Sequence, residues 1–372
     1  YENIKKFTSK GWWNINVVRV DLTDEYAEVG GLMSSKGFSD RKPVSKLVEE
    51  NNAVAGVNGD FFSFKHSSPF GAFIDNGEVK AAPINSPDPY PTFYLDYQNN
   101  ADIAIFDRAM TIKSLRSGKE AVIQNINKPV GEFNFITLFN KNYGTHSIGN
   151  KYHDDLVEMV VVNNVVQEIR IGQPPIPMPQ DGYIIAIRGG AKIHILNNFQ
   201  VGDPVELNVS TTPNYENIKF AIGAGHIILK NGVPTNSNPS LIVNGDQPRT
   251  GIGISQDGKE LIIATIDGRH TSFKGVSLEV FGGIFKDLGA YNAVNLDGGG
   301  STTMAIKPIG EQVKLANLPS DGGERRVPNG VGVFSNAPKG ELSYIKVTTD
   351  DTNMFINTSR RFSIKGYDQY HN

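Results

Sequence analysis

The segment that organises this chain reads Asn295-Leu296-Asp297-Gly298-Gly299-Gly300-Ser301-Thr302-Thr303-Met304. The residues before it, 290–294, are apolar and β-branched enough to predict a short buried strand. Asp297 is therefore expected at a strand end, where the chain turns into glycine. Glycine loses more backbone entropy on folding than any other residue, so side-chain packing does not explain three in a row. They predict positive φ angles, or a group pressed against bare main chain.

The same glycine turn could bind an anion. Successive backbone amides in such a turn can form a concave set of donors, and the hydroxyls of Ser301 and Thr302 would add donors beside Gly299 and Gly300. The alternative is a glycine-rich hairpin that carries a solvated Asp297. The turn alone does not decide between the two.

Composition excludes several classes of protein. The chain has 372 residues, 39% of them hydrophobic and 20% charged, which is typical of a globular protein with a large core. Its formal net charge of −3 argues against a general nucleic-acid binder, because there is no basic excess to neutralise phosphate. It has no cysteine, so thiolate chemistry is excluded. It also has no run of ~18 apolar residues that would span a membrane.

Two domains of unequal size are expected. The composition shifts after residues 335–340, which predicts a catalytic domain over 1–336, then a linker and the first strands of a separate β-module over 337–372. The chain begins at Tyr1 and stops soon after a strand-like run has begun, so we expect it to be part of a longer, processed protein.

A second strand exit repeats the pattern of the first. Residues 53–62 read as a small-residue strand that ends in Asn58, Gly59 and Asp60 and two aromatic residues. A buried strand again presents an amide and a carboxylate where it ends. The alternative interpretation is ordinary turn chemistry, since Asn-Gly-Asp is common in turns.

Arginine and aspartate flank two further strands. Arg249 precedes a strand over 250–254, where a guanidinium suits bidentate recognition of an oxyanion; a surface salt bridge is the alternative. Residues 261–266 predict a third buried strand, which ends at Asp267 and Arg269. Several such exits favour one shared polar site.

The remaining candidates are less decisive. Residues 277–288 predict the best helix of the chain, with Gly289 at its end. Glu279 in its first turn either favours the helix dipole or faces the site. Residues 220–232 predict one glycine-punctuated strand that leads to an Asn-Gly turn, and His226 lies in it, where a structural role is commoner than acid or base chemistry. Arg326 and Asn329 precede the closing strand, 331–334.

The predicted fold class is α+β, with mixed or antiparallel sheets and few helices. Strand patterns far outnumber helical ones and do not alternate with them regularly. Between residues 101 and 210 the pattern is mostly strands and turns, and the histidines there lack the spacing of metal ligands. The sequence leaves the presence of a metal site unknown.

Four motifs together resemble the phosphodiester glycosidase family. The resemblance covers roughly residues 50–334, and the closing Arg326-Val327-Pro328-Asn329 fits it too. The motifs are Gly56-Val57-Asn58-Gly59-Asp60-Phe61-Phe62, Pro248-Arg249-Thr250-Gly251-Ile252-Gly253, Asp267-Gly268-Arg269 with Gly275-Val276-Ser277-Leu278-Glu279, and Asn295 to Met304.

The resemblance implies an exported hydrolase of sugar-1-phosphodiesters, or of related glycosidic bonds in extracellular or cell-envelope glycans. Asp60 stands where many relatives have glycine, and the absence of cysteine favours a bacterial-type member. The tail is similar to the immunoglobulin-like repeats that often follow such domains in bacterial cell-surface proteins. Substrate would be a carbohydrate or sugar phosphate, and no nucleic-acid partner is expected.

Hydrolysis at an anomeric carbon needs a carboxylate near the ring and positive charge or an acid at the leaving group. We expect Asp297 to be nucleophile or general base, with Asp267 or Glu279 as its partner. The expected ligands of the substrate are Asn58, Asp60, His226, Arg249, Arg269, Asn295, Gly299, Gly300, Ser301, Thr302, Arg326 and Asn329.

Two other functions stay open at this point. The β-rich pattern and the aromatic residues Trp12, Trp13, Phe61 and Phe62 would also suit a non-catalytic glycan-binding module. Alternatively, several Asp and Asn side chains could hold Ca²⁺ or Mg²⁺ in a metal-dependent phosphodiesterase. The glycosidase hypothesis requires no cofactor, although a structural or catalytic Ca²⁺ or Mg²⁺ would be compatible with it.

Overall fold

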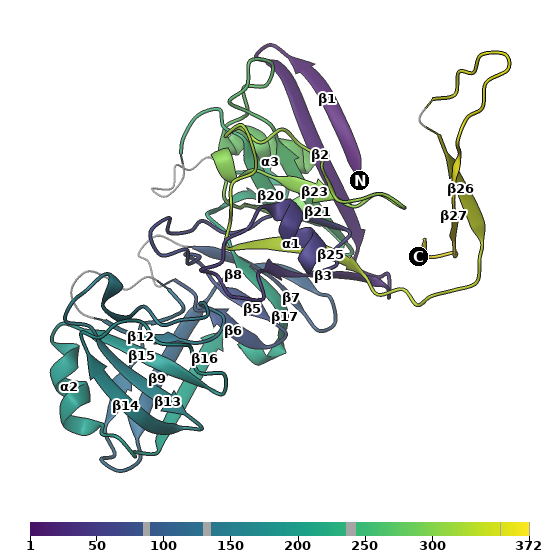
Figure 1. The fold of residues 1–372 in the computed structure, drawn as a ribbon. Coiled ribbons are helices and arrows are strands. Elements are labelled where there is room, and N and C mark those ends of the chain that lie inside the picture. The colour runs from purple at the N-terminus through teal and green to yellow at the C-terminus, as the bar shows by residue number, and fades with distance from the viewer. Residues whose placement is uncertain (85–89, 129–134, 236–242, 350, 372) are drawn as a thin grey trace.

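A computed structural model describes residues 1–84, 90–128, 135–235, 243–349 and 351–371. Figure 1 shows a main body formed by the first and last thirds of the chain, a lobe formed by its middle, and a C-terminal hairpin at the edge of the body. Within the described residues, none of the helices combines the length and the apolar composition that crossing a bilayer requires.

The largest sheet of the body has seven strands, and every neighbouring pair is antiparallel. Its order is β1 (Glu2–Thr8), β2 (Gly11–Asp21), β21 (Glu260–Ile266), β20 (Arg249–Ser255), β22 (Ala290–Asn295), β18 (His226–Lys230) and β19 (Val233–Pro234).

Helix α3 (Leu278–Asp287) packs on this sheet, against β18, β19 and β22. Ser277 caps it by accepting a hydrogen bond from the backbone N–H of Val280. A side chain at Gly253 of β20 would meet the ring of Phe285, which explains why a buried strand carries glycine where α3 crosses it. The helix predicted over 277–288 is confirmed.

Two five-stranded antiparallel sheets complete the body. The first has the order β24 (Lys314–Leu315), β23 (Met304–Ile306), β4 (Ala55–Asn58), β25 (Asn329–Ser335) and β3 (Ala27–Met33). The second has the order β6 (Glu78–Ala81), β5 (Phe73–Asp75), β17 (Ile218–Gly223), β7 (Pro91–Asp96) and β8 (Ala101–Ile105). Helix α1 (Val44–Glu50) packs on β4 and β23.

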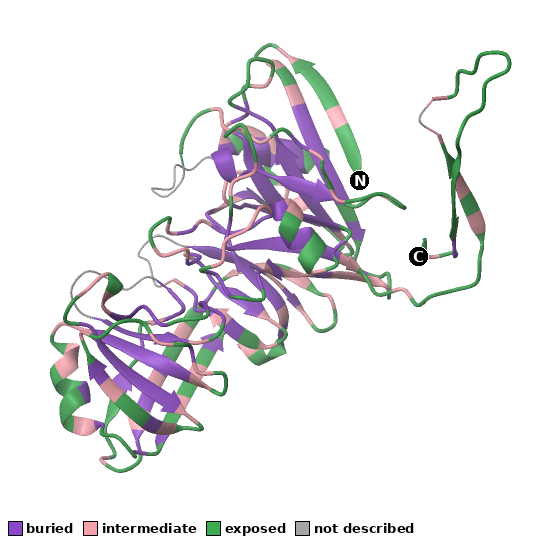
Figure 2. Ribbon diagram, viewed as in Figure 1, coloured by how far each residue is buried: buried purple, intermediate pink, exposed green. Residues whose placement is uncertain are grey.

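One hydrophobic core joins the three sheets. It includes Ile252 and Val294 of the seven-stranded sheet, Val57 and Val331 of the sheet around β4, and Phe220 of the sheet around β17. Figure 2 shows these strands as the buried centre of the body. Strand ends from different sheets are therefore held at fixed positions relative to one another.

The lobe is built from two further sheets around a core that includes Met110, Met159 and Ile185 and that extends to Ile74 and Ala221 of the body. One sheet has the order β10 (Glu120–Val122), β9 (Asp107–Ser114) and β16 (Val205–Thr212). The other has the order β11 (Asn125–Ile126), β12 (Phe135–Phe139), β15 (Gly182–Arg188), β13 (Val157–Val162) and β14 (Val165–Ile171). Helix α2 (Ala191–Asn198) lies against β15. Only β11 and β12 are parallel among the pairs in the described residues.

The C-terminal segment forms the two-stranded hairpin of β26 (Tyr344–Thr348) and β27 (Ser363–Tyr367). Most of its side chains are exposed (Figure 2). The division at residue 336 and the immunoglobulin-like character of the tail stay predictions.

The β-rich architecture with antiparallel sheets and few helices is confirmed. The α+β label stays a prediction. One strand prediction is wrong. Residues 220–232 do not form a single strand: β17 pairs with β5 and β7, whereas β18 pairs with β22 in a different sheet. The chain changes sheets after Gly223, where it passes so close to Gly71 that a side chain would overlap the backbone of that residue.

Candidate functional site

Three strand ends meet at the glycine turn. The backbone N–H of Asp297 donates to the carbonyl of Gly59 at 3.0 Å, and that of Gly299 donates to the carbonyl of Pro248 at 2.9 Å. The Nδ2 of Asn58 donates to the carbonyl of Asp297 at 2.7 Å. The ends of β4 and β22 and the start of β20, which the sequence places far apart, therefore lie together.

Asn58 holds this junction from inside. Its side chain is fully buried, and its Oδ1 accepts from the hydroxyl of Thr250 at 2.8 Å and from the backbone N–H of Thr303 at 3.1 Å. Together with the bond from Nδ2 to Asp297, these contacts use both the oxygen and the nitrogen of the Asn58 side-chain amide. The structure thus gives Asn58 a positioning role beneath the turn, away from solvent.

Asp297 lies at the mouth of the junction and is partly exposed. Its Oδ1 accepts from the backbone N–H of Gly298 at 2.9 Å. Burial raises the pKa of Asp297 from 3.8 to about 6, while the Ser301 hydroxyl and the charges of Arg325 and Arg269 act in the opposite direction. A carboxylate with this pKa is largely ionised at neutral pH, and it can take up a proton in mildly acidic solution.

Two guanidinium groups explain the glycines. A Cβ on Gly299, which has a φ of +59°, would lie 2.9 Å from Nη2 of Arg269. A Cβ on Gly300 would overlap the guanidinium of Arg325 and the carboxylate of Asp321. The prediction that a group presses on bare main chain therefore describes what the structure shows: an arginine lies against each of these two glycines.

Arg325 was not among the sequence candidates, which included its neighbour Arg326. Arg325 donates from Nη1 to Oγ of Ser301 at 3.2 Å and pairs with Asp321 at 2.7 Å. Arg326 is exposed and donates instead to the carbonyl of Arg41 at 2.9 Å. Adjacent arginines in an extended segment point to opposite sides, so the pair offered a choice that the sequence did not resolve.

Arg249 and Arg269 differ in what they offer to a ligand. Arg249 is 2% exposed and donates to the carbonyls of Val276 at 3.2 Å and of Val243 and Gly245, each at 2.9 Å. Burial lowers its pKa to about 10. Its guanidinium thus ties the segment of Val243 and Gly245 to that of Val276. Arg269 is exposed, and its Nε donates to Oε1 of Gln247 at 2.7 Å, which leaves the end of the guanidinium over the turn.

Asp267 and Glu279, the expected partner carboxylates, occupy different settings. Asp267 is 1% exposed and accepts from Nδ2 of Asn14 at 2.6 Å and from the backbone N–H of Leu318 at 3.1 Å. Burial raises its pKa. Glu279 is exposed in the first turn of α3. Within the described residues, no hydrogen bond links either carboxylate to Asp297.

Asp267 nevertheless supports the turn indirectly. The neighbouring Asn317 donates from Nδ2 to the carbonyl of Thr302 at 3.0 Å and accepts from the backbone N–H of Met304 at 2.7 Å. The Asn317 side chain also stabilises the charged form of Asp267. These contacts fix Thr302 and Met304, at the end of the segment that begins at Asp297.

Asp60 lies behind Asp297 in a closed polar pocket. It is 2% exposed; Tyr90 donates its hydroxyl to Oδ1 at 2.5 Å, and the backbone N–H of Gly71 donates to Oδ2. Burial raises its pKa to about 7. Burial also lowers the pKa of the nearby Lys128 to about 7, and this ammonium donates to the carbonyl of Gly71 at 2.6 Å. Tyr90 and Lys128 carried no signal in the sequence.

Four other candidates are buried around the turn. Asn295, Thr302 and Asn329 are at most 1% exposed, and the backbone N–H of Asp60 donates to Oδ1 of Asn329 at 3.2 Å. His226, paired with Asn295 between β18 and β22, is partly buried, and burial lowers its pKa. These side chains shape the floor of the site.

An exposed aromatic residue borders the site. Phe64 is 62% exposed, and the guanidinium groups of Arg325 and Arg41 lie 5.3 and 5.9 Å from its ring centre. Its ring centre is 4.9 Å from that of the buried Phe62. Of Phe61 and Phe62, the aromatic pair expected near the Asp60 exit, Phe62 is buried and Phe61 is partly buried. Phe64, which the sequence did not single out, is the ring that a ligand could reach. Among the described residues, no group of three or more His, Asp or Glu is placed to hold a metal ion.

Residues 157–334 match the family model described as phosphodiester glycosidase. This part of the chain is similar to the phosphodiester glycosidase family. The resemblance seen in the motifs is thereby confirmed for the segments of Arg249, Arg269, Asp297 and Arg326, while the exit at Asn58 and Asp60 lies before the matched residues. The phosphodiester glycosidase family is one of hydrolases, so glycosidase-type hydrolysis is the function that the domain indicates.

Known relatives of this phosphodiester glycosidase domain are distant. Over 85 residues the chain is 39% identical to the uncharacterized SPbeta prophage-derived protein YomE of Bacillus subtilis (strain 168), which covers 23% of this chain and 12% of YomE. A hypothetical protein from Synechocystis shares the fold, with a TM-score of 0.74 at 22% identity over 90% of this chain and 61% of that one. The chain thus spans less than two thirds of either relative.

A Burkholderia pseudomallei K96243 protein that is provisionally named as exported has a TM-score of 0.73 at 21% identity. The match covers 87% of this chain and 74% of that one. At such identities these two structures show a common fold for the phosphodiester glycosidase domain and nothing about its substrate.

Proposed function

We propose that this chain hydrolyses sugar-1-phosphodiesters, with Asp297 as its central carboxylate. In this reaction the bond between the anomeric carbon and the phosphodiester oxygen breaks, water supplies the new hydroxyl of the sugar, and a phosphomonoester leaves. The observation that carries the proposal is the arrangement of Asp297, Ser301 and Arg325 on a glycine turn that a second guanidinium, Arg269, also covers.

The charges suit the two ends of that bond. Asp297, as nucleophile or general base, would stabilise the positive charge that develops at the anomeric carbon. Arg269 and Arg325 would stabilise the negative charge on the departing phosphate, so that a strong general acid is unnecessary. Phe64 offers an apolar face for a sugar ring beside them. Asp267, Asn58 and Asp60 would keep the turn in place.

Hydrolysis of a synthetic methyl diester of an N-acetylhexosamine 1-phosphate tests this proposal, with the reducing sugar as the measured product. Asp297→Asn should lower kcat by about 10³-fold, because the essential carboxylate is lost. Asp287→Asn, on the exposed end of α3, makes the same chemical change away from the site and should retain activity. Turnover by Asp297→Asn within a few-fold of the parent would refute the assignment.

A glycan-binding module is the second candidate, and the exposed ring of Phe64 favours it. Binding of the diester by the parent protein without any release of sugar would support this function. A chelator separates the metal-dependent alternative: we expect full activity in EDTA, because Arg269 and Arg325 supply positive charge at the phosphate. We also propose that the domain acts outside the cell as part of a longer surface protein; the provisional name of the Burkholderia protein, as exported, supports the location outside the cell.

A further inference from the structure

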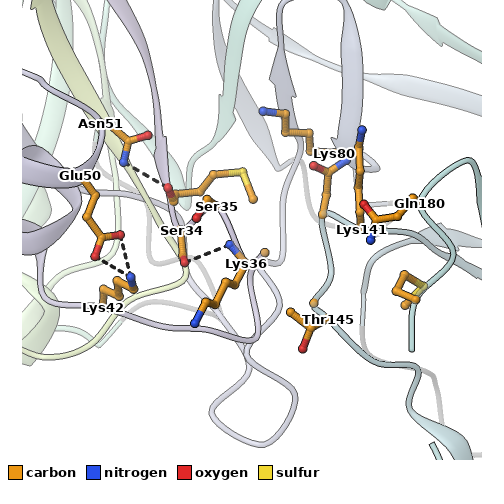
Figure 3. Close-up of a pocket in the computed structure, with 15 residues that line it drawn as sticks. Ser34, Ser35, Lys36, Lys42, Glu50, Asn51, Lys80, Lys141, Thr145 and Gln180 are labelled. Carbon is orange, nitrogen blue, oxygen red and sulfur yellow. Dashed lines mark hydrogen bonds and ion pairs between the residues drawn. The ribbon is translucent and has the colours of Figure 1, made fainter. Parts of the chain in front are cut away.

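A polar cavity of about 730 Å³ lies where the body meets the lobe (Figure 3). One wall comes from the connection between β3 and α1 and from the end of α1, and carries Lys36, Lys42 and Glu50. The facing wall carries Lys141 and Thr145 of the lobe. The volume is in the range of a ligand site and exceeds what a single phosphate needs.

The cavity is lined by more positive than negative charge. Four lysines face it, together with the single carboxylate of Glu50. Two of them are paired: Lys42 with Glu50 at 2.5 Å and with Asp40 at 3.5 Å, and Lys80 with Asp75 at 2.6 Å. Lys36 and Lys141 are exposed and make no ion pair in the part of the chain that the structure describes. Their charge is available to an anion.

Hydroxyl and amide groups lie between the ammonium groups. Ser35, Thr145 and Gln180 line the cavity and are exposed. Figure 3 shows Lys36 on one side of the opening and Lys141, Thr145 and Gln180 on the other. Such a mixture of donors and acceptors matches a ligand that carries hydroxyl groups as well as negative charge.

The cavity connects with the site through one short segment, residues 34–42. Its backbone is fixed to the lobe by bonds from Phe38 to the carbonyl of Asn142 at 2.9 Å, and to the body by bonds between Lys42 and Val327 at 2.9 and 3.1 Å. Arg41, at its end, lies over Phe64, which Arg325 also contacts. Five residues separate Lys36 from Arg41, so their Cα atoms are at most about 18 Å apart.

We propose that this lysine-lined cavity is a distal binding site for a polymeric substrate made of sugars joined through phosphodiesters. The polymer would be held at Lys36 and Lys141 and would continue past Arg41 and Phe64 to Asp297. This inference rests on the proposed function, which it extends from single diesters to a chain of them. A polymer has negative charges at regular intervals, and two basic sites joined by a short surface can bind them together.

Comparison of a polymer with a monomer tests the inference. The probes are a poly(glycosyl phosphate) with repeating sugar-1-phosphodiester bonds and the methyl diester of the same sugar. Lys36→Gln/Lys141→Gln should lower kcat/KM for the polymer roughly tenfold, through KM, because two charge contacts are lost. The methyl diester should be turned over at the parental rate. Lys119→Gln/Lys230→Gln removes the same charge from exposed positions elsewhere and should change neither value.

If the proposed function is wrong, the parent protein will turn over neither the polymer nor the methyl diester. Binding of the polymer to Asp297→Asn protein by titration calorimetry would then still test the cavity, with about tenfold weaker binding expected when Lys36 and Lys141 are also replaced. Equal binding with and without these lysines would overturn the inference. So would equally tight binding of polygalacturonate, since any polyanion would then suffice, or an equal loss of activity on both probes.

Discussion

At the scale of single residues, Asp297 makes a prediction about pH. Burial raises its pKa to about 6, so in the folded protein it keeps its proton to a higher pH than a free aspartate does. If the ionised form is the active one, kcat/KM for the methyl diester should increase with pH through about 6 and fall by about tenfold for each pH unit below. A pH–rate profile measures this fall of kcat/KM at low pH, which is the acid limb of the profile. A flat profile from pH 4.5 to 8 would contradict the role.

Arg325 should set the position of that limb. Its charge lowers the pKa of Asp297, directly and through Ser301, so Arg325→Gln should move the acid limb to higher pH. The adjacent Arg326 donates to the Arg41 carbonyl, and Arg326→Gln should leave the limb where it is. The two profiles, measured under one set of conditions, decide which arginine acts on the carboxylate. Identical shifts in both variants would show that only net charge matters.

At this scale the glycine run singles out Asp297, whose catalytic role stays a prediction, but no sequence signal marks several of the groups around it. The run of glycines identified Asp297 because backbone freedom is visible in a sequence. The roles of Asn58 and Asp267 depended on burial, which comes from strands far along the chain, and both side chains prove to face other protein groups. Tyr90 and Lys128 could not be predicted, since only the folded chain brings them to Asp60.

At the scale of elements, the glycine turn over Gly299–Ser301 is a tight 3-10 turn that must accommodate two arginines. Gly300→Ala would place a methyl group where Arg325 and Asp321 pair. We expect at least a tenfold loss of kcat/KM, because the displaced guanidinium no longer reaches Ser301. A crystal structure or the acid limb of the pH–rate profile would report the displacement.

Gly323→Ala is the matched control for the turn. No atom lies within 4 Å of a Cβ added there, in the connection between β24 and β25 that carries Asp321 and Arg325. It should leave kcat/KM and the thermal midpoint unchanged. A comparable loss in both variants would mean that general flexibility of this connection, and not the space beneath Arg325, determines activity.

Elements with local signals were predictable. α3 has its cap at Ser277, its apolar face and a glycine at position 289 with a φ of +100°, and each signal lies within a few residues of the helix. The change of sheet at Gly223 had no such signal. The close approach of Gly223 to Gly71 is visible only in the folded chain, and the apolar pattern of the sequence continues through Gly223 as if the strand were one.

At the scale of the whole molecule, the hairpin of β26 and β27 should be dispensable for the site. Its contacts with the body include bonds from Lys346 and Lys365 to the carbonyls of Ile309 and Gly310. A chain ending at residue 337 should keep kcat/KM, and its thermal midpoint should fall by no more than about 4 °C, since few buried contacts are lost. Calorimetry checks this. Loss of cooperative unfolding would show that the tail belongs to the catalytic domain.

The β-rich character of the chain could be predicted because alternation and turn residues are local. The separation of body and lobe, and the cavity between them, could not. The cavity combines residues near 36 with residues near 141, and the lysines there look like ordinary surface residues in the sequence. Only the contact between the β3–α1 connection and the lobe reveals them as one group.

The pairing of β3 with β25 has a consequence for synthesis. Gly31 faces Val331 in that pair, so the first strand leaves the ribosome tens of seconds before its partner at about 5–20 residues per second. The lobe, whose strands are closer in sequence, can form contacts during this time, whereas the nascent body waits with unpaired apolar strands. A translation product that stops before β25 would therefore lack both a closed core and a complete site. Its exposed apolar strands would make it prone to aggregation and a target for chaperones and proteases.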